Sequence, residues 1–522
     1  MAYIAKVPVK GHIYLYECEG YREGEKVRSH RTLIGKIDPQ TGEPVYKSEY
    51  IAKMKAVGTP VELNENTPYF SINDVKNSEV KEIGLTQLLD KIAQESGLRE
   101  SIEISNPKYC DELFTLAKHL VASGEPFMHC QEWLENVEIT EDVGSLSSQQ
   151  ISKILADLSI GDIESFYQEW AKKRSEKEYF AIDITSTSSY SELINDVEWG
   201  YNRSGENLAQ VNICMLMGES SKLPIYQTVY SGSLSDVSTL KTTLLKFKHI
   251  ASEKEILAVM DKGFFSKKNV DDLLENNSKF VVAVPFSSAF AKKQVDDVKS
   301  EIDVFANNII VGDDSMRVLT KKRKWGNKYV YAHIFYNPIK AATEREKLYK
   351  KVASLLESAK ANPKKSVENK EIAKYIDIKE ENGTYCVSVK EDVLANSNKY
   401  AGWLVIMSNH LRKAEESIII YRAKDVVEKG FERIKNSLDL ARLRVHSDIA
   451  AQSKILICFI ALVLLSIIHN VMIDKELYKQ YTLKQLMRVT SRRKVQKIGD
   501  HRIEYPLSKK QRKIFEAFGL LL

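Results

Sequence analysis

The sequence predicts an α/β protein whose mixed β-sheet is interrupted by an inserted, β-rich segment and preceded by a mainly helical region. Three observations predict this class. Three strand-like runs follow one another from residue 179, and helix-like and strand-like runs then alternate to residue 285. A strongly charged segment with short strand-like pieces continues to residue 400. The buried-strand pattern then resumes at residue 402 with GWLVIMS. Consecutive strands followed by alternation predict a mixed sheet rather than a purely parallel one.

The amino-acid composition shows which classes of protein are compatible with the sequence. The chain has 522 residues, of which 43% are hydrophobic and 28% are charged, which is typical of a globular protein and excludes a disordered one. The net charge of +5 is too small to establish a nucleic-acid partner by itself. None of the six cysteines forms a C-x-x-C pair or a zinc-binding spacing, so we expect reduced cysteines in a cytosolic protein.

The first third of the chain divides into two predicted regions. Residues 1–60 alternate in places, as in HIYLYE, and carry turn signals such as DPQTGEP, so we expect a β hairpin or meander. Residues 61–176 contain segments with apolar residues spaced by three and four, which predict helices. Residues 177–285 then form the first part of the mixed-sheet core.

The rest of the chain is predicted to hold the insertion, the second part of the core and a basic region. We expect the insertion at residues 286–400, with one long helix at about 341–360, and the second part of the core at 401–475. The apolar run 455–468 is too short to span a bilayer and predicts a buried helix, and the first residues lack the apolar stretch of a signal peptide. Within residues 476–522, the stretch 484–513 carries eleven Lys or Arg against two acids, which suits either DNA-backbone contacts or a plain solvated tail.

Two aspartates stand where apolar runs end. Asp183 follows YFAI, and Asp261 follows ILAVM. A carboxylate in or beside a buried strand is costly unless it is paired or bound to metal. One such residue is usually a cap or an ion-pair partner, but two on separate strands of one sheet favour a shared site at the strand ends.

A third acid comes from the helix expected at residues 413–441. At 100° per residue, Tyr421, Lys424, Glu428 and Lys435 lie along one face of this helix. The apolar residues beside this stripe would hold Glu428 near the sheet. Glu432 and Asp425 compete for the same role, and a solvated charge stripe is the alternative for the whole face.

Three carboxylates from two strands and a helix suit a particular chemistry. Such a set can hold two Mg²⁺ ions, which prefer hard oxygen ligands and keep waters for substrate phosphates. Two ions stabilise the attacking and leaving oxygens of an in-line phosphoryl displacement. Lys424 and Lys435 could then hold a DNA phosphate beside the metals.

The order of these motifs resembles the DDE transposases of bacterial insertion sequences. It is most similar to the subgroup with a Y-R-E-K signature and a β-rich insertion before the catalytic glutamate. The stretches AIDIT, MDKGF and Y-x2-K-x3-E-x6-K carry the resemblance, and WGYNRSGE and YSGSLSDVSTL resemble two further family segments. Lys424 stands where the family has Arg, a change that keeps the charge but weakens bidentate phosphate binding. The neighbouring Arg422 could compensate.

The resemblance implies an RNase H-like catalytic core and a function. Asp183, Asp261 and Glu428 would ligate two Mg²⁺ ions, for which Mn²⁺ would substitute. Water would cut double-stranded DNA at the element's inverted-repeat ends, and the freed 3′-hydroxyl would attack target DNA. The residues implied to contact DNA are Tyr421, Lys424, Lys435, Arg422 and, as a base-stacking aromatic, Trp325.

The resemblance also implies partners and a location. It suggests a homodimer acting on two paired ends, with no membrane partner, in a bacterial cytoplasm near the nucleoid. The helical region 61–176 is the candidate for end recognition, by family likeness and helix content. Two alternatives remain: a metal-dependent nuclease on the same core, which would cut without end specificity, and a catalytically inactive DNA-binding derivative. The local alternative for Trp325 is packing at a hairpin tip or strand.

Overall fold

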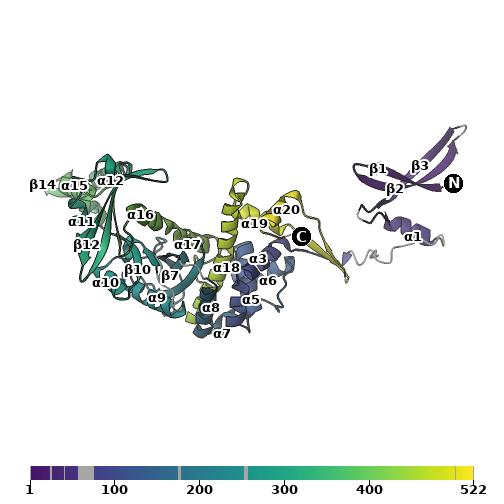
Figure 1. The fold of residues 1–522 in the computed structure, drawn as a ribbon, viewed down its shortest axis with the longest axis horizontal. Coiled ribbons are helices and arrows are strands. Elements are labelled where there is room, and N and C mark those ends of the chain that lie inside the picture. The colour runs from purple at the N-terminus through teal and green to yellow at the C-terminus, as the bar shows by residue number, and fades with distance from the viewer. Residues whose placement is uncertain are drawn as a thin grey trace. The chain divides into compact units, whose positions relative to one another are not determined.

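The computed structural model describes residues 2–23, 26–39, 41–56, 76–174, 178–251, 257–381, 383–499 and 501–520. The chain divides into two compact units (Figure 1). The smaller unit comprises Met1–Val80 and Val495–Tyr505, and the larger comprises Lys81–Lys494 and Pro506–Leu522. All predicted site residues belong to the larger unit.

The N-terminal part of the smaller unit is an antiparallel meander followed by one helix. Its four strands pair in chain order, with a register shift in β2. Leu15, Ile34 and Tyr50 form a small core between the sheet and the helix. The elements are β1 (Ala2–Val9), β2 (His12–Glu23), β3 (Lys26–Ile37), β4 (Pro44–Tyr46) and α1 (Ser48–Ala56).

The larger unit begins with a helical region. Serines begin two of its helices: the Ser147 hydroxyl accepts from an amide of α7, and Ser159 and Asp162 form a reciprocal capping box on α8. The buried Lys118 of α5 donates to Asp90 at 2.7 Å, so its charge is compensated. The elements are β5 (Glu79–Glu82), α3 (Gly84–Glu95), α4 (Leu98–Ser105), α5 (Cys110–Ser123), α6 (Cys130–Asn136), α7 (Ser148–Asp157) and α8 (Ile160–Lys173).

The core is a nine-stranded mixed sheet in the order β11-β12-β13-β16-β10-β9-β6-β7-β8. Strands β6, β7 and β8 form an antiparallel meander, and β9 and β10 continue parallel to β6. This order, β8-β7-β6-β9-β10, is that of an RNase H-like core, so the expected fold class is confirmed. The strands are β6 (Phe180–Ser188), β7 (Gln210–Gly218), β8 (Pro224–Ser231), β9 (Leu257–Met260) and β10 (Lys279–Val284).

Two helices make the connections between the parallel strands. Helix α9 (Asp236–Ile250) joins β8 to β9, and α10 (Lys267–Glu275) joins β9 to β10. The Ser266 hydroxyl accepts from the Asn269 amide and begins α10. These crossovers place β9 beside β6, so that Asp183, the fourth residue of β6, lies next to Asp261, which directly follows β9.

The inserted segment contributes to the core sheet and also builds a small layer of its own. Strands β11 (Asn308–Val311), β12 (Asp314–Trp325) and β13 (Lys328–Tyr336) extend the nine-stranded sheet. The rest is one long helix, shorter helices and a two-stranded sheet around a separate apolar cluster. The remaining elements are α11 (Ala289–Asp296), α12 (Pro338–Ala361), α13 (Pro363–Ser366), α14 (Lys370–Tyr375), β14 (Ile376–Glu381), β15 (Thr384–Val389) and α15 (Glu391–Asn398).

The second part of the core inserts a strand and three helices. Strand β16 (Trp403–Ser408) lies between β13 and β10, antiparallel to both. The helix expected at 413–441 is two helices, α16 (Ala414–Ala423) and α17 (Asp425–Ser437), interrupted at Lys424.

Helix α18 (Asp448–Asp474) contains the apolar run and extends well beyond it. It packs against α5 and α7 on one side and against β8 and α17 on the other (Figure 1). Its length and a mean hydropathy of 2.6 over its most apolar stretch would suffice to cross a membrane, and 78% of that stretch is buried inside the protein. A helix that is apolar on all sides and mostly buried is typical of a protein core, and a buried helix is what the sequence predicts here.

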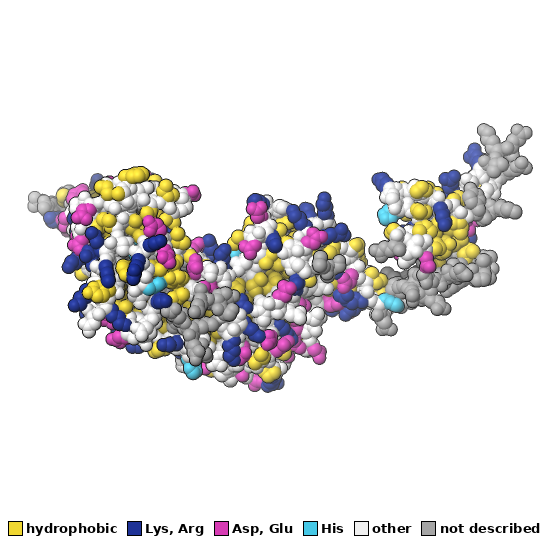
Figure 2. All heavy atoms as spheres, viewed as in Figure 1, with side chains coloured by type: hydrophobic (Ala, Val, Ile, Leu, Met, Phe, Trp, Pro, Cys, Tyr) yellow, Lys and Arg dark blue, Asp and Glu magenta, His cyan; other side chains and the backbone are white. Residues whose placement is uncertain are grey.

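The basic C-terminal stretch is folded in the described residues. It forms α19 (Leu483–Ser491), β17 (Lys494–Ile498), β18 (His501–Glu504) and α20 (Lys509–Ala517). Helix α19 packs against α3 and α20, with Leu486 of α19 and Ile514 and Phe515 of α20 buried. Figure 2 shows Lys and Arg side chains on the surface over α19 and α20.

Candidate catalytic site

The sheet places Asp183, within β6, and Asp261, just after β9, side by side. The ladder between the parallel strands β6 and β9 ends at the pair Ile182 and Met260, and Asp183 and Asp261 are the next residues. Residues at matching positions of neighbouring parallel strands face the same side of the sheet. Both carboxylates are half-buried. Asp183 also accepts a hydrogen bond from the Ile184 amide at 2.8 Å, which fixes its orientation.

Burial and the neighbouring carboxylate change the pKa of Asp183. Burial raises the pKa of its carboxyl to about 6, and the nearby negative charge of Asp261 adds to the increase. The Ile184 amide and the positive charges of Lys424 and Arg203 act in the opposite direction without cancelling it. The ends of β6 and β9 therefore form a place where added positive charge is favourable.

The helical residues approach these acids from α16 and α17. The Tyr421 hydroxyl donates to Asp261 Oδ1 at 2.8 Å. The Lys424 ammonium donates to Glu428 one turn further on and lies 5.6 Å from the centre of the Tyr421 ring. Burial, and then the charge of Asp261, raise the pKa of Tyr421 well above its ordinary value, so the phenol remains a hydrogen-bond donor.

Lys424 links the three acids electrostatically. Burial lowers the pKa of its ammonium, but the Glu428 hydrogen bond and the charges of Asp261, Glu428 and Asp183 outweigh that effect and raise it. The ammonium is thus held in its charged form among all three carboxylates. Its side chain is 14% exposed, whereas that of Glu428 is 51% exposed.

Close packing holds α17 against the sheet. Val427, Phe431 and Ile434 are buried on the face beside the stripe. At Gly430 an added Cβ would lie 2.6 Å from the Met217 sulfur of β7, so a side chain at this position would require Met217 to shift. Glu428, two residues earlier, lies on another face of the helix, is 51% exposed and contacts Lys424.

Lys435 lies on the same helix face, about two turns beyond Glu428. Its ammonium donates to the Ser204 hydroxyl at 2.9 Å. Burial lowers its pKa, and the positive charge of Arg203 lowers it further. Of the two competing acids, Asp425 forms an ion pair with Lys429 at 2.6 Å, and Glu432 is exposed.

Two predicted DNA-contacting residues have partners elsewhere. Arg422 forms an ion pair with Asp314 at 2.6 Å and donates to the Val311 carbonyl at 3.1 Å, both at the β11–β12 turn. Those contacts direct its guanidinium away from the partners of Lys424. Its proposed compensation for Lys424 therefore has no support from the geometry.

Trp325 is half-buried at the end of β12. Its indole N–H donates to Asp271 at 2.7 Å, and its ring packs edge-on against Phe265 and Phe290, with centroids 6.5 and 5.5 Å away. These contacts match the local-packing alternative. Base stacking by Trp325 stays a prediction from the family likeness.

An additional cluster adjoins the acids and was not given a role from the sequence. Arg203 forms an ion pair with Asp236 and donates to the Ser186 hydroxyl at 3.4 Å. Asp236 also lies against the turn after Asp261, because a Cβ on Gly263 would be 3.0 Å from its Oδ2 atom. The segments WGYNRSGE and YSGSLSD supply this pair, so their order in the sequence was the available signal.

The donor set fits a divalent cation in part. Among the residues that the structure describes, no group of three or more His, Cys, Asp or Glu side chains is arranged to hold a metal ion. Asp183 and Asp261 nevertheless offer adjacent carboxylate oxygens, the ligands that Mg²⁺ prefers. The raised pKa of Asp183 and the ammonium of Lys424 among the acids both indicate a place for positive charge. Glu428 would complete the set once its bond to Lys424 is released.

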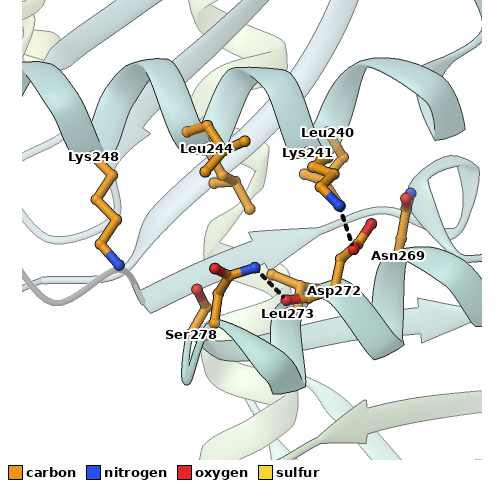
Figure 3. Close-up of a pocket in the computed structure, with 10 residues that line it drawn as sticks. Leu240, Lys241, Leu244, Lys248, Asn269, Asp272, Leu273 and Ser278 are labelled. Carbon is orange, nitrogen blue, oxygen red and sulfur yellow. Dashed lines mark hydrogen bonds and ion pairs between the residues drawn. The ribbon is translucent and has the colours of Figure 1, made fainter.

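A small pocket lies between α9 and α10 and is separate from these residues (Figure 3). It encloses about 30 Å³, enough for about one or two waters. Leucines line it, and an ion pair between Lys241 and Asp272 crosses one end at 2.6 Å. None of the predicted site residues belongs to its lining.

The RNase H-like sheet with carboxylates at the ends of neighbouring strands defines a class of nucleic-acid-processing enzymes, the nucleases and transposases. A family model described as the transposase DDE domain matches residues 174–464, which is more than half of the chain. The chain belongs to this transposase family, whose members generally use divalent metals. The prediction of a DDE transposase is thereby confirmed, whereas the bacterial origin and the Y-R-E-K subgroup stay predictions.

The other comparisons add a distant structural likeness. One similar solved structure is the cryo-EM structure of the piggyBac transposase synaptic complex with hairpin DNA, at 10% sequence identity and a TM-score of 0.37. The match covers 78% of this chain and 78% of that one. No curated protein matches the sequence.

Proposed function

We propose that this protein is a DNA transposase that binds the inverted-repeat ends of an insertion sequence, cuts them by metal-dependent hydrolysis and joins the 3′-hydroxyl ends to target DNA. One observation carries the proposal. Asp183 and Asp261 follow a shared ladder of neighbouring strands, Tyr421 donates to Asp261 at 2.8 Å, and Lys424, three residues further on, pairs with Glu428. Two adjacent carboxylates, with a third bound by a nearby lysine, are suited to exchanging that positive charge for divalent cations.

Each residue has a defined part in this scheme. Asp183 and Asp261 hold the metal through adjacent carboxylate oxygens, and Glu428 joins them when Lys424 turns to a DNA phosphate. When bound, two Mg²⁺ ions, for which Mn²⁺ would substitute, would supply charge that activates water and stabilises the in-line displacement. Tyr421 holds Asp261 in place through its 2.8 Å hydrogen bond.

The basic side chains then bind the substrate. Lys424 and Lys435 pair with phosphates beside the acids, and Tyr421 contacts the same backbone. Contacts with phosphates position the DNA without reading its sequence. The helices of region 61–176 are proposed to read the element ends. The protein would act as a homodimer on two paired ends, in a bacterial cytoplasm near the nucleoid.

The test uses DNA carrying the inverted repeats that should flank this gene. Wild-type protein and Asp183→Ala are incubated with this DNA, a second target DNA and Mg²⁺ or Mn²⁺. We expect cleavage at the repeat tips and joining by the wild type alone. Cutting without regard to the repeats would favour the nuclease alternative. DNA binding without cutting in either metal would favour an inactive derivative.

A further inference from the structure

The connection between β6 and β7 carries two exposed aromatic side chains. Trp199 is 64% exposed and Tyr201 is 82% exposed, whereas Trp170 in the helical region is fully buried. They belong to the stretch Glu198–Glu206, here called the aromatic loop. Large aromatic rings left in water are unusual in a folded protein and indicate a surface that contacts another molecule.

The backbone of the aromatic loop is fixed on both sides of these rings. The Glu198 amide and carbonyl pair with Gln210 at 3.0 Å in both directions. The Glu198 carboxylate also accepts from the hydroxyls of Ser231 and Ser233.

Gly200, between the two aromatics, is pinned by close packing. A Cβ there would lie 2.0 Å from the Gly232 carbonyl oxygen, so only glycine fits. The Tyr201 carbonyl accepts from the Gln210 side-chain Nε2 at 2.9 Å. The two rings are therefore presented to solvent from a rigid backbone, and a partner would bind them without first ordering the loop.

The same loop continues directly into the candidate catalytic site. Arg203 forms an ion pair with Asp236. Its positive charge lowers the pKa of Asp183, against the larger increase that burial causes. Ser204 accepts from Lys435 of α17 at 2.9 Å. Two cationic side chains, Arg203 and Lys435, are thus held at the part of the loop that follows the two aromatics.

Aromatic rings next to cations match the chemistry of a DNA strand whose bases are unpaired. Bases stack on aromatic side chains with about 1–3 kcal/mol each, largely independent of sequence, while Arg and Lys pair with the phosphates. Trp325 differs from these two aromatics, because its N–H is bound to Asp271 and its ring is packed edge-on against Phe265 and Phe290.

We infer that Trp199 and Tyr201 stack on unpaired nucleobases of the DNA strand whose phosphate lies at Asp183 and Asp261. This inference rests on the proposed function and extends it. The aromatic loop would hold the bases, and Arg203 and Lys435 would hold the adjoining phosphates. A fully paired duplex, whose bases are already stacked, would gain little from the two rings.

The experiment uses the full chain with Asp183→Ala, which prevents cleavage, and an inverted-repeat duplex ending in a three-nucleotide unpaired tail that contains 2-aminopurine. Stacking quenches the fluorescence of this base. In this background, Trp199→Ala with Tyr201→Ala should abolish the quenching and weaken binding of the tailed DNA by about 10- to 100-fold. Binding of the fully paired duplex should change less than about threefold, and Trp199→Phe should retain the quenching.

Tyr349→Ala is the matched control, because Tyr349 is a 53% exposed aromatic on α12, outside the aromatic loop. Unchanged quenching and affinity in the double variant would overturn the inference. So would a change of oligomeric state in sedimentation with quenching retained, because the rings would then contact a second copy of the chain.

The inference and the proposed function fail in different ways. Cleavage and joining by the wild type, with quenching independent of the two aromatics, would leave the function intact and overturn the stacking. Quenching that requires them, in a protein that cuts no repeat DNA, would support the stacking and overturn the proposed reaction. Absence of any DNA binding by the wild type would overturn both.

Discussion

The candidate site has a strand half and a helix half, and they are built in different ways. The strand half, Asp183 and Asp261, is set by neighbouring register positions of the sheet and is half-buried. The helix half, on α16 and α17, lies across a helix interruption at Lys424, and Glu428 remains 51% exposed. The comparison teaches that the sheet fixes two acids in advance. Side-chain pairing with Lys424 determines the position of the third.

The largest expected effect is on cleavage. Asp183→Asn, Asp261→Asn and Glu428→Gln should each lower the rate of repeat-end cleavage on the order of 1,000-fold, since each removes a charged metal ligand. Single-turnover cleavage of labelled repeat DNA measures it. Asp425→Asn is the matched control on the same helix, because Asp425 pairs with Lys429, and its rate should stay near that of the wild type. Equal losses for Asp425→Asn and Glu428→Gln would show that the helix half has been assigned wrongly.

Removing the Asp183 charge should stabilise the folded protein although it abolishes cleavage, and this gain should distinguish the strand half from the helix half. Asp183→Asn should raise the free energy of unfolding by about 1–3 kcal/mol at pH 7, because it removes a carboxylate whose pKa is raised to about 6. Glu428→Gln, at an exposed position, should stay within about 0.5 kcal/mol. Urea unfolding at pH 7 measures both. A destabilised Asp183→Asn protein would contradict the electrostatic account of the strand half.

The same raised pKa predicts a pH dependence. A carboxyl with a higher pKa in the folded state binds its proton more tightly there, so its stabilising contribution is complete below about pH 4. That contribution is lost as pH rises from about 4 to about 6. Urea midpoints over this range should fall more steeply in the wild type and in Glu428→Gln than in Asp183→Asn. If the urea midpoints of all three proteins fell equally with pH, Asp183 would not be the cause of the pH dependence.

The packing of the helix half can be tested at Gly430. Gly430→Val should lower the free energy of unfolding by about 1–3 kcal/mol, since its side chain would meet the Met217 sulfur. Cleavage should fall as well, because α17 would be pushed away from the strand acids. Lys429→Ala, the exposed neighbour, is the control and should change unfolding by less than about 0.5 kcal/mol. A Gly430→Val protein with wild-type stability and cleavage would show that the close approach is not needed.

The smallest effect is expected at the position that differs from the family pattern. Lys424→Arg should keep cleavage within about threefold of the wild type, because the positive charge among the acids is retained. Lys424→Gln should lower it about 10-fold and reduce the affinity for repeat DNA. Cleavage rates and salt-dependent binding distinguish the two. Equal behaviour of both variants would show that the charge at this position has no role in the helix half.

The strand half could be predicted from the sequence more fully than the helix half. An apolar run ending in aspartate indicates a carboxylate in or at the end of a buried strand, and two such runs placed Asp183 and Asp261 on one sheet. Asp261 directly follows β9, whereas β6 continues beyond Asp183 to Ser188. The helical spacing of Tyr421, Lys424 and Glu428 was also readable. The interruption at Lys424 was not, because the segment contains neither proline nor glycine at that point.

Contacts between distant segments were beyond sequence reasoning. The hydrogen bond between Ser204 and Lys435 joins residues 231 apart in the chain, and nothing local signals it. Basic neighbours made Trp325 a candidate for DNA stacking, but its bond to Asp271 depends on where β12 lies against α10. Whether a side chain such as that of Trp325 is exposed depends on the distant segments that pack against it, and the local sequence does not show these.

The position of β16 has a consequence for how the chain acquires its structure. Its residues 403–408 pair with β13 on one side and β10 on the other, although both neighbours were made earlier. Until this strand arrives, two long strand edges stay open to solvent and to other chains. Pairing between segments so distant in sequence is slow. A ribosome that stalls within the insertion would therefore release a polypeptide prone to edge-to-edge association, and completion of translation is itself a safeguard against aggregation.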